Sequence, residues 1–578
     1  MKIFSKYIVL GLFALGTFSC TDFDEMNTNP NSPSAENPAT ESVMASCMRK
    51  AFHEDRFEFW RGVVLHAERF AGHVEGGYAG CWWGGSTAYD YNEGWTAGVW
   101  DAYNAASFNG YGGSLFANLK IIIEYYEANP EADYANEFIG ISHTLKAFQF
   151  IKLTDLFGDI PYTEHGNIDI ASPKFDAQKQ VYDDLEAQLR KVVEVYLVDD
   201  VLISTMGEFD LVYGGNVSQW RKFANSLRLR MALRRSFVDE AGAKLILAEI
   251  VKYPLLDSNE DNVMVARTTS STDLQNQYYG FFKTWPGTIP NAPLSWDGYS
   301  LMWGPGPGAF IPAREIVETM KGSDLFAAEV NDGGSATENI NAVAGIFDPR
   351  IDKFFMRPNG DVDGTHKGRP ARADYFLKDG NITTINSDEE EGSVNNYSWM
   401  HPSIWYDGGT WAPVSMDYAE VCLAMAEALQ RNLVSSPKSD AAWLQAGLEA
   451  SCDRWGATAG SFPEDVVAKY NVASADDKFA IIATERWVSA YTVPHQAYSV
   501  LRRTGHPKYC SLDRTAKITG VWTNPDGSTE NRSIEVYAAG STNYKLPQRM
   551  RVPESEVSVN ANVPEENKDM VNKVWWAK

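Results

Sequence analysis

Long segments of this chain place apolar residues at the spacing of an α-helix. In residues 132–162, Phe138, Ile141, Leu145 and Phe148 follow one another at intervals of three and four, which puts them on one helix face. A glycine and a proline end that pattern. Helical patterns recur in residues 40–71, 115–129, 178–197, 218–237, 415–432, 440–456 and 475–491. We therefore expect a mainly α-helical protein.

The helical segments come in neighbouring pairs of about 15–20 residues each. Such pairs are typical of helix-hairpin solenoids of the tetratricopeptide type. A clean 34-residue signature is absent, so we expect degenerate repeats. Thr40 is the predicted N-cap of the first helix, although no Glu follows three residues later to complete a capping box. The apolar positions of two further helices are Val181, Leu185, Leu189 and Val192, and Trp220, Phe223 and Leu227.

The helical pattern fades between about residues 255 and 410, where Gly, Pro, Asn and Asp become frequent. A structureless loop of this length inside a domain is improbable, so we expect an irregular, loop-rich part packed on the helices. The predicted organisation is one domain over residues 41–578. Within it, helical repeats span about 41–250 and 411–505 and flank the loop-rich part at about 255–410.

The first residues have the features of an export signal. Lys2 and Lys6 precede a short apolar run, and small residues precede Cys20. The run is too short to span a bilayer, so residues 1–19 are predicted to be a lipoprotein signal peptide, with lipidation at Cys20. Thr17 stands where a lipobox usually has Leu, which leaves an ordinary cleaved signal as the alternative. Residues 20–40, rich in Asn, Pro and Ser, form the predicted tether.

Composition excludes several classes of function. The 578 residues have a formal net charge of −25, which argues against a nucleic-acid partner because phosphate binding needs a basic surface. The six cysteines include no CxxC pair, so neither a zinc ribbon nor a thioredoxin-like site is indicated. Cys422 lies on an apolar helical face and is expected in the core.

Catalytic, cofactor and metal motifs are weak or missing. Residues 84–88, GGSTA, approach the G-x-S-x-G nucleophile motif but end in Ala, and no strand is evident before them. His66 and His73 could share a helix face, yet no third metal ligand is indicated. Asp361 and Asp363 have a calcium-loop-like spacing without the full pattern, so a solvated turn is the simpler interpretation. We expect no catalytic residues, no cofactor and no metal.

Aromatic residues on glycine-rich segments are the strongest chemical signal. Residues 81–95 read CWWGGSTAYDYNEGW, and residues 283–308 add three more tryptophans. A flat indole covers the C–H face of a sugar ring, and glycines let a bulky ligand approach. The alternative is that these indoles anchor the loop-rich part to the helices. Trp100 and Tyr103, at helical spacing, are expected in the core. The candidate stacking residues are Trp82, Trp83, Trp285, Trp296 and Trp303.

Several stretches in consistent order resemble the SusD-like (SusD/RagB) family of outer-membrane nutrient-binding lipoproteins. They include CTDFDEMNTNPNSP, TLKAFQFIKLTDLFGDIPYTE, WRKFANSLRLRMALR, FDPRIDKFF, YAEVCLAMAEAL, ERWVSAYTVPHQAYSVLRRTGHP and RMRVPESEVSVN. Together they cover essentially the whole mature chain. The resemblance implies a SusD-like fold in which tetratricopeptide-like hairpins support an irregular ligand-binding part.

The resemblance also implies a function. It indicates a surface-exposed outer-membrane lipoprotein that captures oligosaccharides and passes them to a TonB-dependent, SusC-like barrel without catalysing a reaction. The family has no invariant ligand-binding motif, so no site residue transfers by matching. Peptide capture in the same role remains open, as do a surface glycosidase and a purely structural scaffold; peptides would need hydrogen-bonding edges more than flat aromatic faces.

Overall fold

The computed structural model gives the arrangement of most of the helical chain and of parts of the loop-rich interval. The described residues are 39–52, 62, 66–76, 89, 93–94, 97, 100–101, 115–165, 167, 169–268, 310–323, 341–357, 366, 375–378, 381–384, 398–405, 411–511, 517–523, 528–535, 540–543 and 545–578.

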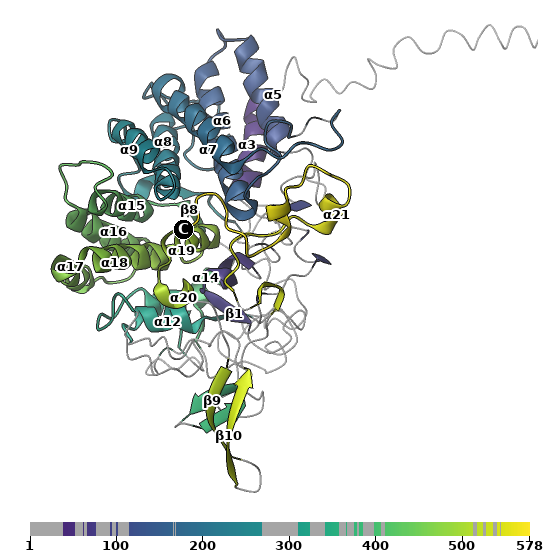
Figure 1. Cartoon of the computed structure of the whole chain (residues 1–578). Coiled ribbons are helices and arrows are strands. Elements are labelled where there is room, and N and C mark those ends of the chain that lie inside the picture. Colours follow the sequence, from purple (N-terminus) through teal and green to yellow (C-terminus); the bar gives the residue numbers. More distant parts are fainter. Residues whose placement is uncertain are drawn as a thin grey trace, which may run out of the picture.

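Helices from the two halves of the chain form one continuous body (Figure 1). Consecutive helices pack on each other, as the pairs α5 with α6, α8 with α9 and α15 with α16 show. The predicted mainly α fold is confirmed. The first group comprises α3 (Thr40–Phe52), α5 (Leu115–Ala128), α6 (Ala135–Phe157), α7 (Gln178–Lys191), α8 (Val217–Arg235) and α9 (Glu240–Ile250). The second comprises α15 (Tyr418–Gln430), α16 (Asp440–Arg454), α17 (Phe462–Val472), α18 (Ala475–Ser489) and α19 (Pro494–Thr504).

The predicted apolar faces are the buried faces. Phe138, Ile141, Leu145 and Phe148 of α6 all belong to the main core, as do the apolar positions of α7 and α8. Cys422 is buried in α15. The predicted cap at Thr40 is wrong, because α3 begins at this residue and its hydroxyl lies 3.0 Å from the Tyr126 hydroxyl. A long-range contact therefore takes the place of the local capping bond.

Short strands bring distant parts of the chain together. Strand β2 (Val263–Met264) pairs with β8 (Val414–Met416), so the loop-rich interval leaves and rejoins the helices at one place. Strand β1 (Val74–Gly76) pairs with β3 (Phe310–Pro312), and β4 (Phe355–Met356) pairs with β7 (Trp399–Met400).

A four-stranded sheet lies at the end of the molecule farthest from the first helices (Figure 1). Its order is β10 (Thr529–Glu535), β9 (Lys517–Thr523), β6 (Asn381–Thr384) and β5 (Tyr375–Lys378). The remaining short helices are α12 (Arg314–Met320), α13 (Ile351–Phe354), α14 (Pro402–Trp405), α20 (Lys508–Ser511) and α21 (Glu554–Val557).

Buried charges join the helices at two centres. At the first, Asp155 of α6 accepts hydrogen bonds from the Tyr182 hydroxyl at 2.5 Å and the Trp576 indole at 2.8 Å, and forms an ion pair with Arg234 of α8 at 3.1 Å. This centre fixes the C-terminal tail against the first helices. Removal of one partner from such a buried centre is costly, because it leaves a charge buried without compensation.

The second centre is Glu427 of α15. Its carboxylate contacts Arg486 of α18, Arg503 of α19 and Arg431. Burial alone would raise the pKa of Glu427, but Arg503 and Arg486 outweigh it and hold that pKa well below its usual range. The centre joins α15, α18 and α19 of the second helical group.

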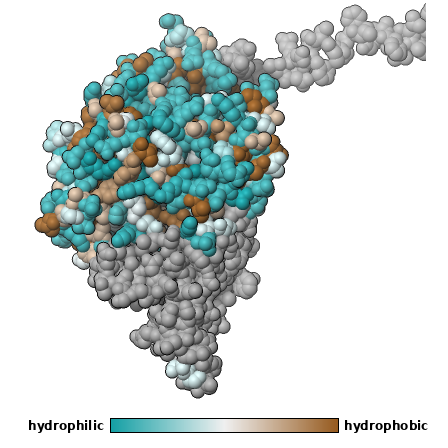
Figure 2. Space-filling view, in the orientation of Figure 1, coloured by the Kyte–Doolittle hydropathy of each residue, from teal (hydrophilic) through white to brown (hydrophobic). Residues whose placement is uncertain are grey.

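The face seen in Figure 2 is mostly hydrophilic, with hydrophobic residues scattered among charged ones. This agrees with the net charge of −25. Among the described helices, none is both long and apolar enough to cross a membrane.

Candidate functional site

The candidate stacking residues Trp82, Trp83, Trp285, Trp296 and Trp303 lie outside the described residues, and so does the lipidation candidate Cys20. The same holds for GGSTA at 84–88, for Asp361 and Asp363, and for Tyr103. The framework from which the aromatic segments extend is described. Trp100 is buried, with its ring parallel to that of Phe175 at 5.8 Å, which confirms its predicted place in the core.

The β1–β3 ladder joins the two strand ends next to the aromatic segments. These ends, Gly76 and Phe310, are called the roots of the segments below. Gly76 is the register partner of Phe310, and Glu75 is the partner of Ile311. In the sequence, residues 77–81 separate Gly76 from Trp82, and residues 304–309 separate Trp303 from Phe310. The two segments identified by their aromatic residues therefore leave the described fold at neighbouring strand ends.

The turn before β1 is fixed to helix α18. The Trp487 indole donates to the carbonyl of Ala71 at 2.6 Å, and the His73 ring lies 4.7 Å from the Trp487 ring. Gly72 has φ of +77°, and a Cβ there would lie 2.9 Å from the Sγ of Cys510, so this turn requires glycine. Burial lowers the pKa of His73 to about 3, so the imidazole is neutral in the fold.

The segment after β3 is equally fixed. The amide of Ala313 donates to the carbonyl of His73 at 2.9 Å, and α12 then buries Ile316, Val317 and Met320. The amide of Asp348 in turn donates to the carbonyl of Met320 at 2.8 Å.

Arg350 then connects this region to the second helical group. Its guanidinium binds Asp348 and Glu485 at 2.6 Å each and the Ser451 hydroxyl at 2.9 Å. The roots of both aromatic segments are therefore attached to rigid helices, which is the arrangement that positions binding loops.

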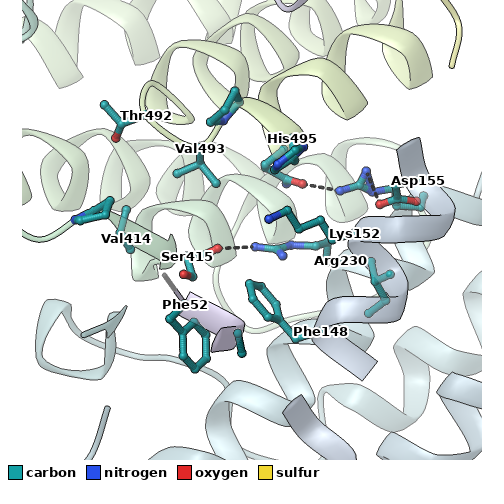
Figure 3. A pocket seen from close by; sticks show the side chains of 16 residues that line it. Phe52, Phe148, Lys152, Asp155, Arg230, Val414, Ser415, Thr492, Val493 and His495 are labelled. Atoms are coloured by element: carbon teal, nitrogen blue, oxygen red, sulfur yellow. Dashed lines mark hydrogen bonds and ion pairs between the residues drawn. The ribbon is translucent and has the colours of Figure 1, made fainter. Parts of the chain in front are cut away.

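A cavity of about 110 Å³ lies between α6, α8, β8 and the start of α19 (Figure 3). Its polar groups include three cationic side chains, Lys152, Arg230 and Arg234, and the carboxylate of Asp155. The lining residues are Ala51, Phe52, Phe148, Ile151, Lys152, Asp155, Arg230, Arg234, Pro413, Val414, Ser415, Thr492, Val493, Pro494, His495 and Gln496.

The arginines of this cavity are held by neighbouring elements. Arg230 contacts both carboxylate oxygens of Glu420, at 2.8 and 2.7 Å, and donates to the carbonyl of Ser415 at 3.1 Å. Arg234 donates to Gln496 at 2.5 Å. Burial lowers the pKa of Lys152 to about 7. No sequence motif marks this cavity, because its walls come from five separate stretches of chain.

A hydrogen-bonded chain, called the relay below, joins Ser398, His366 and Asp352. Its order matches that of the nucleophile, base and acid in a catalytic triad. The His366 Nδ1 lies 3.2 Å from the Ser398 hydroxyl, and the Nε2 lies 2.8 Å from Asp352. Burial lowers the pKa of His366, although the hydrogen bond to Asp352 acts in the opposite direction. Ser398 is 0 % exposed, however, and a nucleophile must reach its substrate. The relay instead joins three separate segments of the loop-rich part.

In the part of the chain that the structure describes, no group of three or more His, Cys, Asp or Glu side chains is placed to hold a metal ion. His66 and His73 are both buried against aromatic rings, His66 at 5.5 Å from Phe70.

Solved structures show the same fold. A SusD homologue from Bacteroides uniformis is 21 % identical, with 93 % of this chain and 99 % of that chain covered and a TM-score of 0.65. A homologue from Bacteroides vulgatus is 18 % identical, covering 93 % and 97 %, with a TM-score of 0.65. A chitin-binding SusD homologue from Flavobacterium johnsoniae is 18 % identical, covering 93 % and 98 %, with a TM-score of 0.62. These likenesses establish the fold.

Sequence comparison identifies the family. No curated protein sequence matches the chain. A SusD-like family model, described as "Starch-binding associating with outer membrane", matches residues 61–281 and 319–523. Those residues include β1, the aromatic stretch that follows it, and every helix of the two groups except α3. The chain therefore belongs to the SusD-like family.

Proposed function

We propose that this protein captures oligosaccharides and that the two aromatic segments supply its stacking surface. The observation that supports this most directly is the pairing of Gly76 with Phe310. The ladder brings the roots of two segments together, and these segments contain six tryptophans in a glycine-rich setting, five of which are the stacking candidates. Trp82, Trp83, Trp285, Trp296 and Trp303 are the proposed stacking residues, because indole faces bind the C–H faces of sugar rings.

The family supports a glycan ligand over a peptide. The matching family model names starch binding, and the homologue from Flavobacterium johnsoniae is described as chitin-binding. A protein that binds extended peptides commonly offers a free strand edge. Strands β1 and β3 pair with each other, so each already uses one edge at the roots of the aromatic segments.

We further propose that the protein works at the surface of the outer membrane. The lipid would be attached at Cys20, residues 20–40 would serve as the tether, and a TonB-dependent, SusC-like barrel would accept the captured glycan. The export features of residues 1–19 and the outer-membrane association named by the family model support this placement. The protein is proposed to bind without catalysis, which fits the burial of Ser398 in the Ser398–His366–Asp352 relay.

Calorimetric titration of the protein from Thr21 onward tests the proposal. The panel contains neutral glucans, chitin oligosaccharides, acidic glycans and oligopeptides. Saturable heat from one glycan class without product formation supports capture. Heat from peptides alone moves the ligand assignment to peptides, and release of shorter glycans would show a glycosidase.

A further inference from the structure

The cavity between the helical groups has no role in the glycan site proposed above. Its walls come from the end of α3, from α6, α8 and β8, and from the residues that lead into α19. A second, smaller cavity shares Val414, Val493 and Gln496 with it, so hollow space continues along this seam.

The size of the cavity limits what it can hold. Its volume of about 110 Å³ is smaller than the engineered cavity of roughly 150 Å³ that takes up benzene. The space is therefore on the scale of a molecule no larger than benzene, with about six non-hydrogen atoms, and a hexose has about twice that number. This favours a small organic molecule over a sugar ring.

One side of the cavity offers donors of hydrogen bonds. Lys152 ends between His495 and Arg230, as Figure 3 shows. The carboxylate of Asp155 is already occupied by Tyr182, Trp576 and Arg234. Arg230 is likewise paired with Glu420, so the two arginines are balanced by two carboxylates and a protonated Lys152 adds one positive charge. This excess charge favours an anionic ligand, and a ligand carboxylate accepts hydrogen bonds without donating any.

The other side is apolar. The rings of Phe52 and Phe148 lie below the Arg230 guanidinium in Figure 3, whereas Val493 lies above it. An inorganic anion would gain no binding energy from contact with these apolar side chains. An alkyl chain of two or three carbons would gain about 0.8 kcal/mol per buried methylene there.

Thr492, in the cavity wall, has an unusual backbone conformation. Its φ is +69°, a conformation that a β-branched residue rarely adopts, and such strain is retained where the surroundings require it. The side chain is buried, and its hydroxyl has no hydrogen-bond partner among the described residues. A polar group of this kind gains from a ligand or from water in the cavity.

We propose that this cavity binds a short-chain monocarboxylate, with the carboxylate beside Lys152 and Arg230 and the alkyl chain against Phe52 and Phe148. The charge on Lys152 makes the binding depend on pH. Because burial lowers the pKa of Lys152 to about 7, binding of an anion should weaken as the pH rises well above 7.

Calorimetric titration of the protein from Thr21 onward with sodium propionate and sodium butyrate tests this site. Sodium chloride and sodium phosphate at equal ionic strength are the comparison anions. Saturable binding of propionate or butyrate at pH 6, weaker at pH 8.5, is expected. Lys152→Met should weaken it at least tenfold and still fold, since an apolar replacement of a buried charge is often neutral for stability. Ala51→Leu, which adds carbon to the cavity wall, should also weaken it.

Lys120→Met is the matched control, because the Lys120 side chain on α5 is 71 % exposed. This variant should bind propionate and butyrate like the unchanged protein. No saturable binding by either carboxylate would overturn the proposal, as would equal binding by phosphate or equal affinity in Lys152→Met and Lys120→Met. Glycan titration in the presence of propionate separates the two sites, because the proposed cavity ligand should leave glycan affinity unchanged.

Discussion

Gly76 of β1 and Phe310 of β3 face each other as register partners, although α5 to α9 and the first part of the loop-rich interval separate them in the chain. The pairing explains how two aromatic stretches so far apart in sequence can serve one ligand. Helix α18 holds the first strand through Trp487, and α12 continues from the second. The scaffold of the proposed site is therefore rigid at its roots.

A cross-link tests this relationship. Cα atoms of directly opposed residues in an antiparallel pair are about 4.5–5.5 Å apart, which is within the range of a disulfide. Gly76→Cys with Phe310→Cys should therefore oxidise to an intramolecular bond, measured as a loss of two thiols by mass spectrometry. Glycan affinity should stay within about twofold of the reduced form, because the ladder does not need to open. Failure to cross-link, or loss of glycan binding upon cross-linking, would contradict the claim that the β1–β3 pairing is rigid.

Removal of single stacking rings should weaken glycan binding without unfolding the protein. Trp82→Ala and Trp296→Ala are each expected to lower affinity about tenfold, equivalent to about 1.4 kcal/mol, in calorimetric titration. The melting midpoint should move by no more than about 2 °C. Trp443→Ala serves as the control, because Trp443 lies on α16 and packs beside Lys438. A large loss of stability with intact binding would place the substituted indole in the core.

Asp155 should matter for stability and leave glycan affinity intact. Asp155→Asn leaves Arg234 without its buried counter-charge and weakens the contacts to Tyr182 and Trp576. The expected loss is about 3–5 kcal/mol in the free energy of unfolding, measured by denaturant titration. Glu124→Gln removes an exposed ion pair with Lys120 and should cost less than about 1 kcal/mol. Equal effects of the two substitutions would refute the role given to the Asp155 centre.

Acid should loosen the turn that leads into β1. His73 is neutral in the fold with a pKa of about 3, whereas an unfolded histidine titrates near 6.5. The unfolded chain therefore binds more protons at acid pH. The stability contributed by neutral His73 is complete above about pH 6.5 and is lost as the pH falls towards 3, by up to about 1.4 kcal/mol per pH unit.

His73→Phe removes this titration and keeps a ring beside Trp487. Denaturant titrations of the variant between pH 7.5 and 4.5 should show a shallower loss of stability than those of the unchanged protein. An identical pH dependence in both would show that other groups account for the acid sensitivity.

Helical periodicity predicted the framework well, because each helix buries one stripe against its neighbours. The stripe from Phe138 to Phe148 and the apolar positions of α7 and α8 are all in the core. The helix α9, with Ala243, Leu247 and Ile250 buried, was missed, although its spacing also fits a helix. Short helices add little periodic signal, and tertiary packing decides whether they form.

The sequence pattern could not predict the long-range contacts. Nothing local to Val74–Gly76 indicates that its partner is Phe310–Pro312, and the return of Trp576 to Asp155 has no local signal either. The polar cavity was missed for the same reason, since Lys152, Arg230 and His495 come from three elements. The aromatic stretches were recognisable because their composition differs from that of a buried helix; their role as the stacking surface stays a prediction.

Calorimetric titration of the protein from Thr21 onward against glucan and chitin oligosaccharides, with the Trp82→Ala and Trp296→Ala variants in parallel, tests the central claim most directly. We predict saturable, one-to-one binding of one glycan class and a loss of about tenfold in each variant. Glycan binding that is unchanged in both variants, or heat from peptides in place of glycans, would contradict the claim that the aromatic segments joined by the β1–β3 ladder form a glycan site.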